Sequence, residues 1–69
     1  MSNKVYELAK VVGTSSTSVE DAIDNAIGYA AKTRAQLSWF QVLETRGRVQ
    51  DGKVAEYQVT LELGARRDA

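Results

Sequence analysis

A strict alternation of side chains in residues 54–63, VAEYQVTLEL, constrains the fold of this chain more than any other feature. From Ala55 to Leu63 the odd positions carry Ala, Tyr, Val or Leu, and the even positions carry Glu, Gln or Thr. This period of two is typical of a β-strand with one buried face. Asp51-Gly52 lies just before the strand, and Asp-Gly is a strong signal for a two-residue type I′ turn. The pattern therefore predicts a hairpin of strands 39–49 and 54–63 around this turn.

A further strand is predicted near the N-terminus. Residues 5–12, VYELAKVV, are rich in β-branched and aromatic side chains, and Gly13 is expected to end the strand. Apolar residues occur at both odd and even positions of this segment. We therefore expect both of its faces to be covered, one by a helix and the other by a neighbouring subunit.

A helix is predicted between the first strand and the hairpin. It has two alternative capping boxes, Thr17 with Glu20 or Ser18 with Asp21. The hydroxyl run could also suggest a phosphate cradle, but no glycine-rich loop or following lysine supports that interpretation. Gly28 falls inside the helix, where it indicates close packing against an unidentified neighbour. The apolar stripe at i, i+3, i+4 spacing comprises Val19, Ala22, Ile23, Ala26, Ile27, Ala30 and Leu37.

The order of these elements predicts an α+β fold, β-α-β-β, for a single domain over residues 1–69. A right-handed β-α-β crossover makes the first two strands parallel in direction. The third strand runs back and can lie between them. The result is a three-stranded antiparallel sheet of order 1-3-2 packed on one helix.

Composition excludes several classes of function. The chain has 69 residues, with neither cysteine nor histidine, so disulfides and the commonest metal ligands are missing. We expect no catalytic residues, no metal site and stabilisation by oligomerisation. Lys plus Arg and Asp plus Glu each number 9, which argues against binding to nucleic acid. Without a membrane span or a signal-peptide h-region, the expected protein is soluble and cytoplasmic.

The predicted hairpin also assigns the two faces of the sheet. With a two-residue turn, Phe40 pairs with Leu63 and Thr45 with Gln58, and paired residues share a face. A bulge near Gly47 would reverse part of this assignment, because a slip of one residue exchanges the faces. The face toward the helix takes Phe40, Val42, Leu61 and Leu63. The opposite face takes Trp39, Gln41, Leu43, Thr45, Gln58 and Thr60.

Trp39, the only tryptophan, is thus predicted to point away from the helix, and Arg46 toward it. An outward indole is either an anchor between subunits or a platform for a ligand. Gln58 faces the same way as Trp39 but lies about 20 Å from it, at ~3.3 Å per residue. Two subunits packed across their outer faces could bring Trp39 and Gln58 to one small ligand, whereas one subunit could not.

Three segments together resemble the dodecins. They are VVGTS at 11–15, the Trp39-Phe40 pair followed by Arg46-Gly47, and EYQVTLELG at 56–64. They occur in the family's order and spacing, and the resemblance extends from about Tyr6 to Arg66. Each segment is modest alone, but the combination is specific in a chain of this length.

The resemblance implies a hollow homododecamer that stores, buffers or photoprotects flavin without turnover. It implies isoalloxazine rings stacked between copies of Trp39 and hydrogen-bonded by Gln58. It associates Arg46 and Arg66 with a ligand phosphate, so FMN is the first candidate, ahead of riboflavin and lumichrome. Coenzyme A is a ligand of some bacterial members, but no site for it can be assigned here. One departure from the bacterial pattern is Ala65, where an aromatic residue is common between Gly64 and Arg66.

Three other functions are alternatives to flavin binding. An empty assembly scaffold would use Trp39 only as an interface anchor, and flavin absorbance in the purified protein would separate the two hypotheses. A small enzyme has little support without His or Cys. An RNA-binding α/β domain is disfavoured by the balanced charge.

Overall fold

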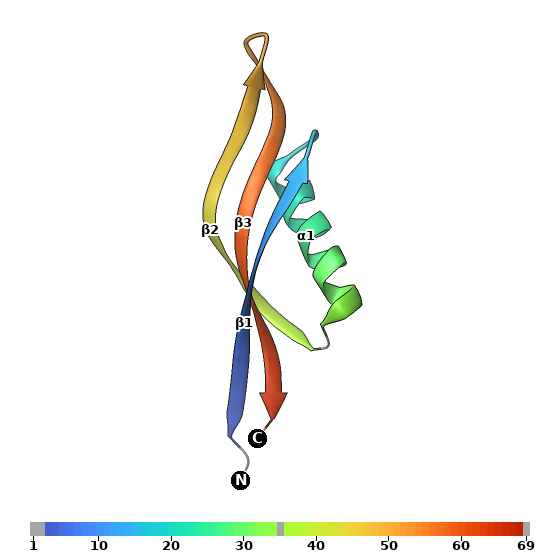
Figure 1. Cartoon of the computed structure of the whole chain (residues 1–69), viewed down its shortest axis with the longest axis vertical. Coiled ribbons are helices and arrows are strands. Elements are labelled where there is room, and N and C mark those ends of the chain that lie inside the picture. The colour runs from blue at the N-terminus through green and yellow to red at the C-terminus, as the bar shows by residue number, and fades with distance from the viewer. Residues whose placement is uncertain (1–2, 35, 69) are drawn as a thin grey trace.

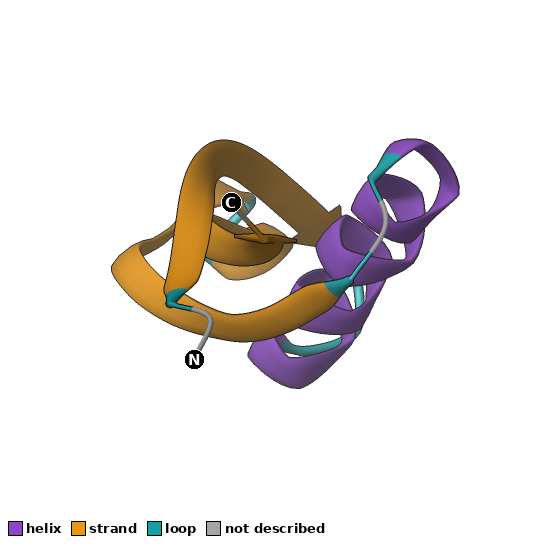
Figure 2. Ribbon diagram, turned by 90° about the horizontal axis from the view of Figure 1, so that it is seen from below, coloured by secondary structure: helices purple, strands orange, loops and turns teal. Residues whose placement is uncertain are grey.

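The computed structural model describes residues 3–34 and 36–68 and contains one helix and three strands (Figure 1). In chain order these are β1 (Lys4–Ser15), α1 (Val19–Thr33), β2 (Leu37–Gln50) and β3 (Lys53–Asp68). Both pairings are antiparallel and the strand order is β1-β3-β2, which confirms the predicted α+β fold. Figure 2 shows α1 on one side of a strongly twisted sheet.

The core lies between α1 and the helix-facing side of β3. Three helix alanines one turn apart, Ala22, Ala26 and Ala30, are buried against the sheet. Their short side chains allow the strands to approach the helix closely. The buried hydrophobic residues of β3 are Val59, Leu61, Leu63 and Ala65, so the odd positions of that strand face the helix as predicted.

Gly13 is where β1 comes closest to the helix. A methyl group at this position would overlap the carbonyl oxygen of Ala22 and would lie 2.7 Å from Cβ of Ala26. Gly13 does not end the strand, as the sequence had led us to expect, because β1 continues to Ser15. Its missing side chain instead makes room for the helix.

Replacing Gly13 with alanine is therefore expected to destabilise the protein. The methyl group would meet a helix backbone atom that cannot rotate away, and overpacking of this kind costs about 1–3 kcal/mol. Urea unfolding at a fixed protein concentration measures the effect. Gly28→Ala is the matched control, since a methyl there meets nothing within 4 Å and should be neutral or stabilise by up to about 1 kcal/mol. Equal stabilities of Gly13→Ala and the parent would contradict this packing.

The start of α1 follows one of the two predicted capping patterns. Ser18 is the N-cap, and its hydroxyl accepts a 3.0 Å hydrogen bond from the backbone N–H of Asp21. The Asp21 carboxylate does not complete the box with Ser18 but accepts from the Ser15 hydroxyl at 2.7 Å. Ser15 also accepts from the N–H of Thr17, so it anchors the turn between β1 and α1.

Two other features of α1 differ from expectation. The helix ends at Thr33, and Leu37, the last residue of the predicted stripe, is the first residue of β2. No atom lies within 4 Å of a methyl built on Gly28, so close packing inside the described chain does not explain this glycine.

The β2–β3 hairpin has the predicted turn and, between this turn and Phe40, two register shifts, one of them close to Gly47, where the sequence had left a bulge open, and one that the sequence did not indicate. Asp51 and Gly52 have φ angles of 54° and 74°, as a type I′ turn requires. Gln50 pairs with Lys53, and Phe40 pairs with Leu63, as expected. Between these points the register shifts twice, at Ala55 near the turn and at Leu43 further along β2. The two shifts cancel, so only the residues between them change face.

The sheet is much longer than the helix that covers it. The molecule extends 57 Å along its longest axis, whereas a helix of 15 residues is about 22 Å long. In Figure 1 the hairpin extends past the helix at one end, and β1 and β3 extend past it at the other. Phe40 has the predicted register but is not buried, since 48% of its surface is exposed. Val42 is likewise exposed, so neither residue belongs to the core of a single copy.

Candidate ligand-binding surface

The candidate site is the face of the sheet opposite α1, which we call the outer face. Its residues are the even positions of β3 from 56 to 66 and their partners, because the odd positions from Val59 to Ala65 are buried on the helix side. From β1 they are Tyr6, Leu8, Lys10, Val12 and Thr14. From β2 they are Trp39, Gln41, Glu44, Arg46 and Arg48. From β3 they are Glu56, Gln58, Thr60, Glu62, Gly64 and Arg66.

Trp39 lies at one end of the outer face and is 42% exposed. It pairs with Gly64, and its indole lies against the α-carbon of that glycine. The ring of Tyr6 lies beside it, with centroids 6.1 Å apart and planes tilted by 56°. Tyr6 pairs in turn with Arg66, so Arg66 belongs to the same end. This end, which we call the indole end, combines an open aromatic surface with a guanidinium group.

Gln58 and Arg46 lie at the other end of the outer face and pair directly with each other. The Gln58 amide donates from Nε2 to Oε1 of Glu56 at 3.0 Å. The Arg46 guanidinium lies 3.8 Å from Oε1 of Glu44, and both side chains are more than half exposed. An ion pair this exposed contributes little stability. This end, which we call the amide end, therefore offers a donor, an acceptor and a cation that can exchange its partner for a ligand.

The position of Arg46 corrects the sequence-based assignment. A regular hairpin pairs Gln58 with Thr45 and turns Arg46 toward the helix. The bulge at Leu43 and the shift at Ala55 move Arg46 opposite Gln58 and Thr45 opposite the buried Val59. Leu43 itself has no partner in the register. Arg46 thus shares the outer face with Trp39, because the register shifts between Arg48 and Val49, close to the position near Gly47 where a bulge had been considered.

The four predicted site residues therefore form two pairs on one face, Trp39 with Arg66 and Gln58 with Arg46. Gly64, the partner of Trp39, is six residues from Gln58 along β3. At ~3.3 Å per residue the two ends are about 20 Å apart. One copy of the chain cannot place both pairs around a single small molecule.

Two residues of the indole end, Tyr6 and Gly64, were not identified from the sequence. The signal for Tyr6 was its even position in β1, which puts it on the same face as Trp39 once the register is known. The signal for Gly64 was a glycine inside a strand, which often marks a close approach of another group.

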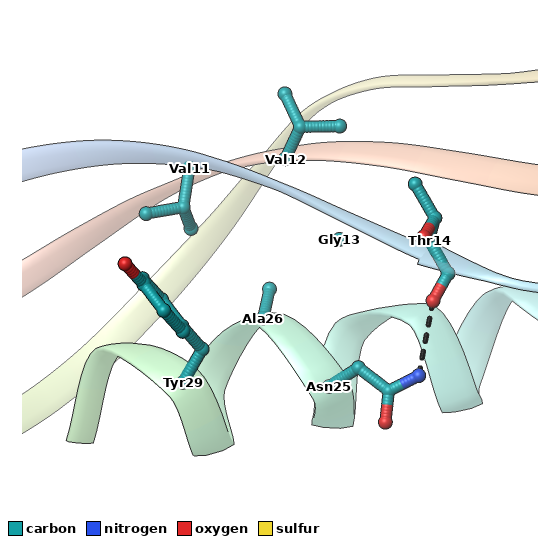
Figure 3. A pocket seen from close by; sticks show the side chains of 7 residues that line it. All are labelled: Val11, Val12, Gly13, Thr14, Asn25, Ala26 and Tyr29. Atoms are coloured by element: carbon teal, nitrogen blue, oxygen red, sulfur yellow. Dashed lines mark hydrogen bonds between the residues drawn. The ribbon is translucent and has the colours of Figure 1, made fainter. Parts of the chain in front are cut away.

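A groove lies between β1 and α1 (Figure 3). Its volume is about 450 Å³, and it is lined by Val11, Val12, Gly13, Thr14, Asn25, Ala26 and Tyr29. Asn25 donates from Nδ2 to the carbonyl oxygen of Thr14 at 3.0 Å and ties the helix to the strand (Figure 3). None of the lining side chains is an acid or a base of the kind that catalysis uses near neutral pH. The lining of the groove therefore offers no catalytic group of that kind.

Within residues 3–34 and 36–68, no cluster of three or more acidic, histidine or cysteine side chains is placed to hold a metal ion. Over the same residues, the helix is not long and apolar enough to cross a membrane.

Comparison with known proteins gives consistent matches over the whole length. The family model described as Dodecin matches residues 5–68. The curated Dodecin of Thermus thermophilus is 48% identical over 63 residues, which cover 91% of either sequence. The structure of dodecin from Streptomyces coelicolor has a TM-score of 0.93 and 45% identity, and the match covers 100% of this chain and 99% of that one. The structure of dodecin from Streptomyces davaonensis has a TM-score of 0.91 and 43% identity, and the match covers 97% of this chain and 98% of that one.

Proposed function

Because the chain belongs to the dodecin family, we propose that it is a homo-oligomer, a dodecamer, that binds flavin between its subunits. The isoalloxazine ring would stack on Trp39 of symmetry-related copies, and Gln58 would hydrogen-bond the polar edge of the ring. The function is storage or photoprotection of flavin in the cytoplasm rather than catalysis.

The observation that supports this proposal best is the split of the site residues into two ends of one face. Trp39 and Arg66 lie about 20 Å from Gln58 and Arg46, at ~3.3 Å per residue along β3. A ligand that needs an indole, an amide and a guanidinium must therefore lie between copies of the chain. A site of this kind exists only in the assembled protein, which accords with the family's self-association.

The chemistry of both ends suits a flavin. The indole of Trp39 has a large exposed surface, and a flat aromatic ligand gains from offset stacking on it. The amide of Gln58 can donate and accept at once, as the pyrimidine edge of a flavin requires. An indole stacked on a flavin can also donate an electron to the excited ring. Such quenching shortens the time available for photochemistry, which supports a protective role.

Identification of the bound molecule tests this proposal. The purified protein is expected to show flavin absorbance, and mass spectrometry of the denatured extract should identify FMN, riboflavin or lumichrome, and coenzyme A if it is also bound. Riboflavin titrated into ligand-free protein should lose its fluorescence. An assembled protein that neither carries nor quenches flavin would instead favour the alternative function, an empty scaffold with Trp39 as the interface anchor.

Arg46 is proposed to favour a phosphorylated flavin. It shares the outer face with Gln58, and its ion pair with Glu44 at 3.8 Å is weak enough to yield to a phosphate. Hydrogen bonds to charged groups contribute about 1.5–3 kcal/mol. Arg46→Ala is therefore expected to weaken FMN binding by about tenfold or more, while riboflavin affinity changes little. Fluorescence titration of both ligands measures the ratio.

The matched control for Arg46→Ala is Arg34→Ala. Arg34 is exposed at the C-terminal end of α1 and carries the same charge. Its removal lowers the net charge equally but should leave both affinities unchanged. If Arg46→Ala weakens FMN and riboflavin by the same factor, the arginine does not recognise the phosphate.

A further inference from the structure

Gly64 is the residue on which the indole of Trp39 lies. It is buried, and a methyl group at this position would come closer than 3.0 Å to Nε1, Cε2 and Cζ2 of Trp39. These three atoms are bonded in sequence along one side of the indole. That side of the ring therefore occupies the space that any larger residue at position 64 would fill.

The backbone of Gly64 gives no other reason for a glycine. The described glycine with a positive φ is Gly52, in the hairpin turn. Gly64 is thus in a conformation that alanine adopts without strain. The indole is what an alanine at this position would meet, so Gly64→Ala tests the ring contact without a backbone effect.

Tyr6 is the second neighbour of the indole. It reaches Trp39 from β1, the strand on the far side of β3, with the ring centroids 6.1 Å apart. The indole is therefore positioned by two groups, the backbone of β3 beneath it and an aromatic ring beside it. Trp39 still keeps 42% of its surface exposed, so part of the ring remains available to a ligand.

We propose that Gly64 is a positioning residue for the ligand platform: its missing side chain sets how deep the indole lies on the sheet. This inference rests on the proposed function, in which copies of Trp39 stack on a flavin. Carbon atoms in contact are separated by about 3.5–4.0 Å, so a methyl at position 64 would displace the indole by roughly 1.5 Å. In the proposed site two symmetry-related indoles enclose one flavin, and the substitution would displace both of them. The space between the two indoles would then no longer match the thickness of one flat ring.

The test uses Gly64→Ala in the full chain, with riboflavin as the ligand. Because Trp39 is the only tryptophan, its near-ultraviolet circular dichroism and its fluorescence anisotropy decay report the indole without any ligand. We expect both signals to change, far-ultraviolet circular dichroism to be preserved, and riboflavin affinity to fall about tenfold or more. Gly28→Ala, a glycine with open space around it, is the control and should leave all of these as in the parent.

Each outcome separates this inference from the proposed function. Unchanged indole signals and unchanged riboflavin affinity in Gly64→Ala would overturn the inference while flavin binding stands. If the parent itself does not bind riboflavin, the proposed function fails, and the indole signals of Gly64→Ala still decide whether Gly64 positions the ring.

A double variant covers the case in which Gly64→Ala disturbs folding. In Gly64→Ala with Trp39→Ala, no indole is left for the methyl group to displace. The double variant should then unfold at the same urea concentration as Trp39→Ala alone. If Gly64→Ala instead lowers the urea midpoint by as much in the Trp39→Ala background as it does in the parent, the methyl group meets something other than the indole. The inference would then be wrong.

Discussion

Trp39→Ala is expected to lower flavin affinity by roughly two to four orders of magnitude. In the proposed site two symmetry-related indoles stack on one ligand, so a single substitution removes both contacts. Stacking of a nucleic-acid base on an aromatic side chain contributes ~1–3 kcal/mol, and two such contacts give the expected loss. The quenching of flavin fluorescence should disappear with the indole. A titration of riboflavin into the ligand-free variant measures both effects.

Oligomer size must be measured in parallel, because Trp39 is also a candidate interface anchor. A variant that assembles but binds and quenches riboflavin like the parent would show that Trp39 is not the platform. If the variant fails to assemble, Trp39→Phe keeps an aromatic ring in place and allows the two roles to be separated. The milder change should then assemble and bind riboflavin with an intermediate affinity.

The chain is also expected to have no stable folded monomer. Among the described residues, the buried core of one copy holds three side chains larger than alanine, namely Val59, Leu61 and Leu63. Eleven large hydrophobic residues of the described chain are exposed, among them Val49 at 71%. A chain of 69 residues with neither disulfide nor metal ligands of the usual kinds gains little stability alone. Unfolding should therefore accompany dissociation.

Phe40→Asp tests the dependence of folding on assembly. Phe40 is 48% exposed on β2, which the helix leaves largely uncovered, and a carboxylate there should prevent burial against another copy. We expect loss of the oligomer in analytical ultracentrifugation together with loss of circular dichroism. Ser16→Asp adds the same charge in an exposed turn and should assemble normally. A compact, folded monomer of Phe40→Asp at micromolar concentration would refute this expectation.

Local sequence patterns were sufficient to predict the element order and the hairpin. The alternation in 54–63 identified the buried face of β3, and Asp51-Gly52 identified the turn, because each depends on a period or a dihedral angle that a few neighbouring residues determine. Ser18 was one of two candidate caps for the same reason. The outward orientation of Trp39 followed from counting residues back from the turn.

The end of the helix and the burial of individual side chains depended on distant parts of the chain. Leu37 fits the helical stripe, yet it belongs to β2, because the helix ends at Thr33. Phe40 faces the helix side but stays exposed, because α1 packs mainly against β1 and β3 and leaves the edge strand β2 largely uncovered. Neither fact is contained in the residues next to these positions.

In the candidate site, too, some features follow from the sequence and others only from the tertiary structure. The sequence alone determined that Trp39 and Gln58 share the outer face, since the two register shifts cancel between the turn and Trp39. Only the tertiary structure placed Arg46 beside Gln58, because a bulge adds one unpaired residue to a strand and leaves no periodic signal in the sequence. Only the tertiary structure placed the indole on Gly64 and beside Tyr6, because those contacts join three strands that are far apart in the chain.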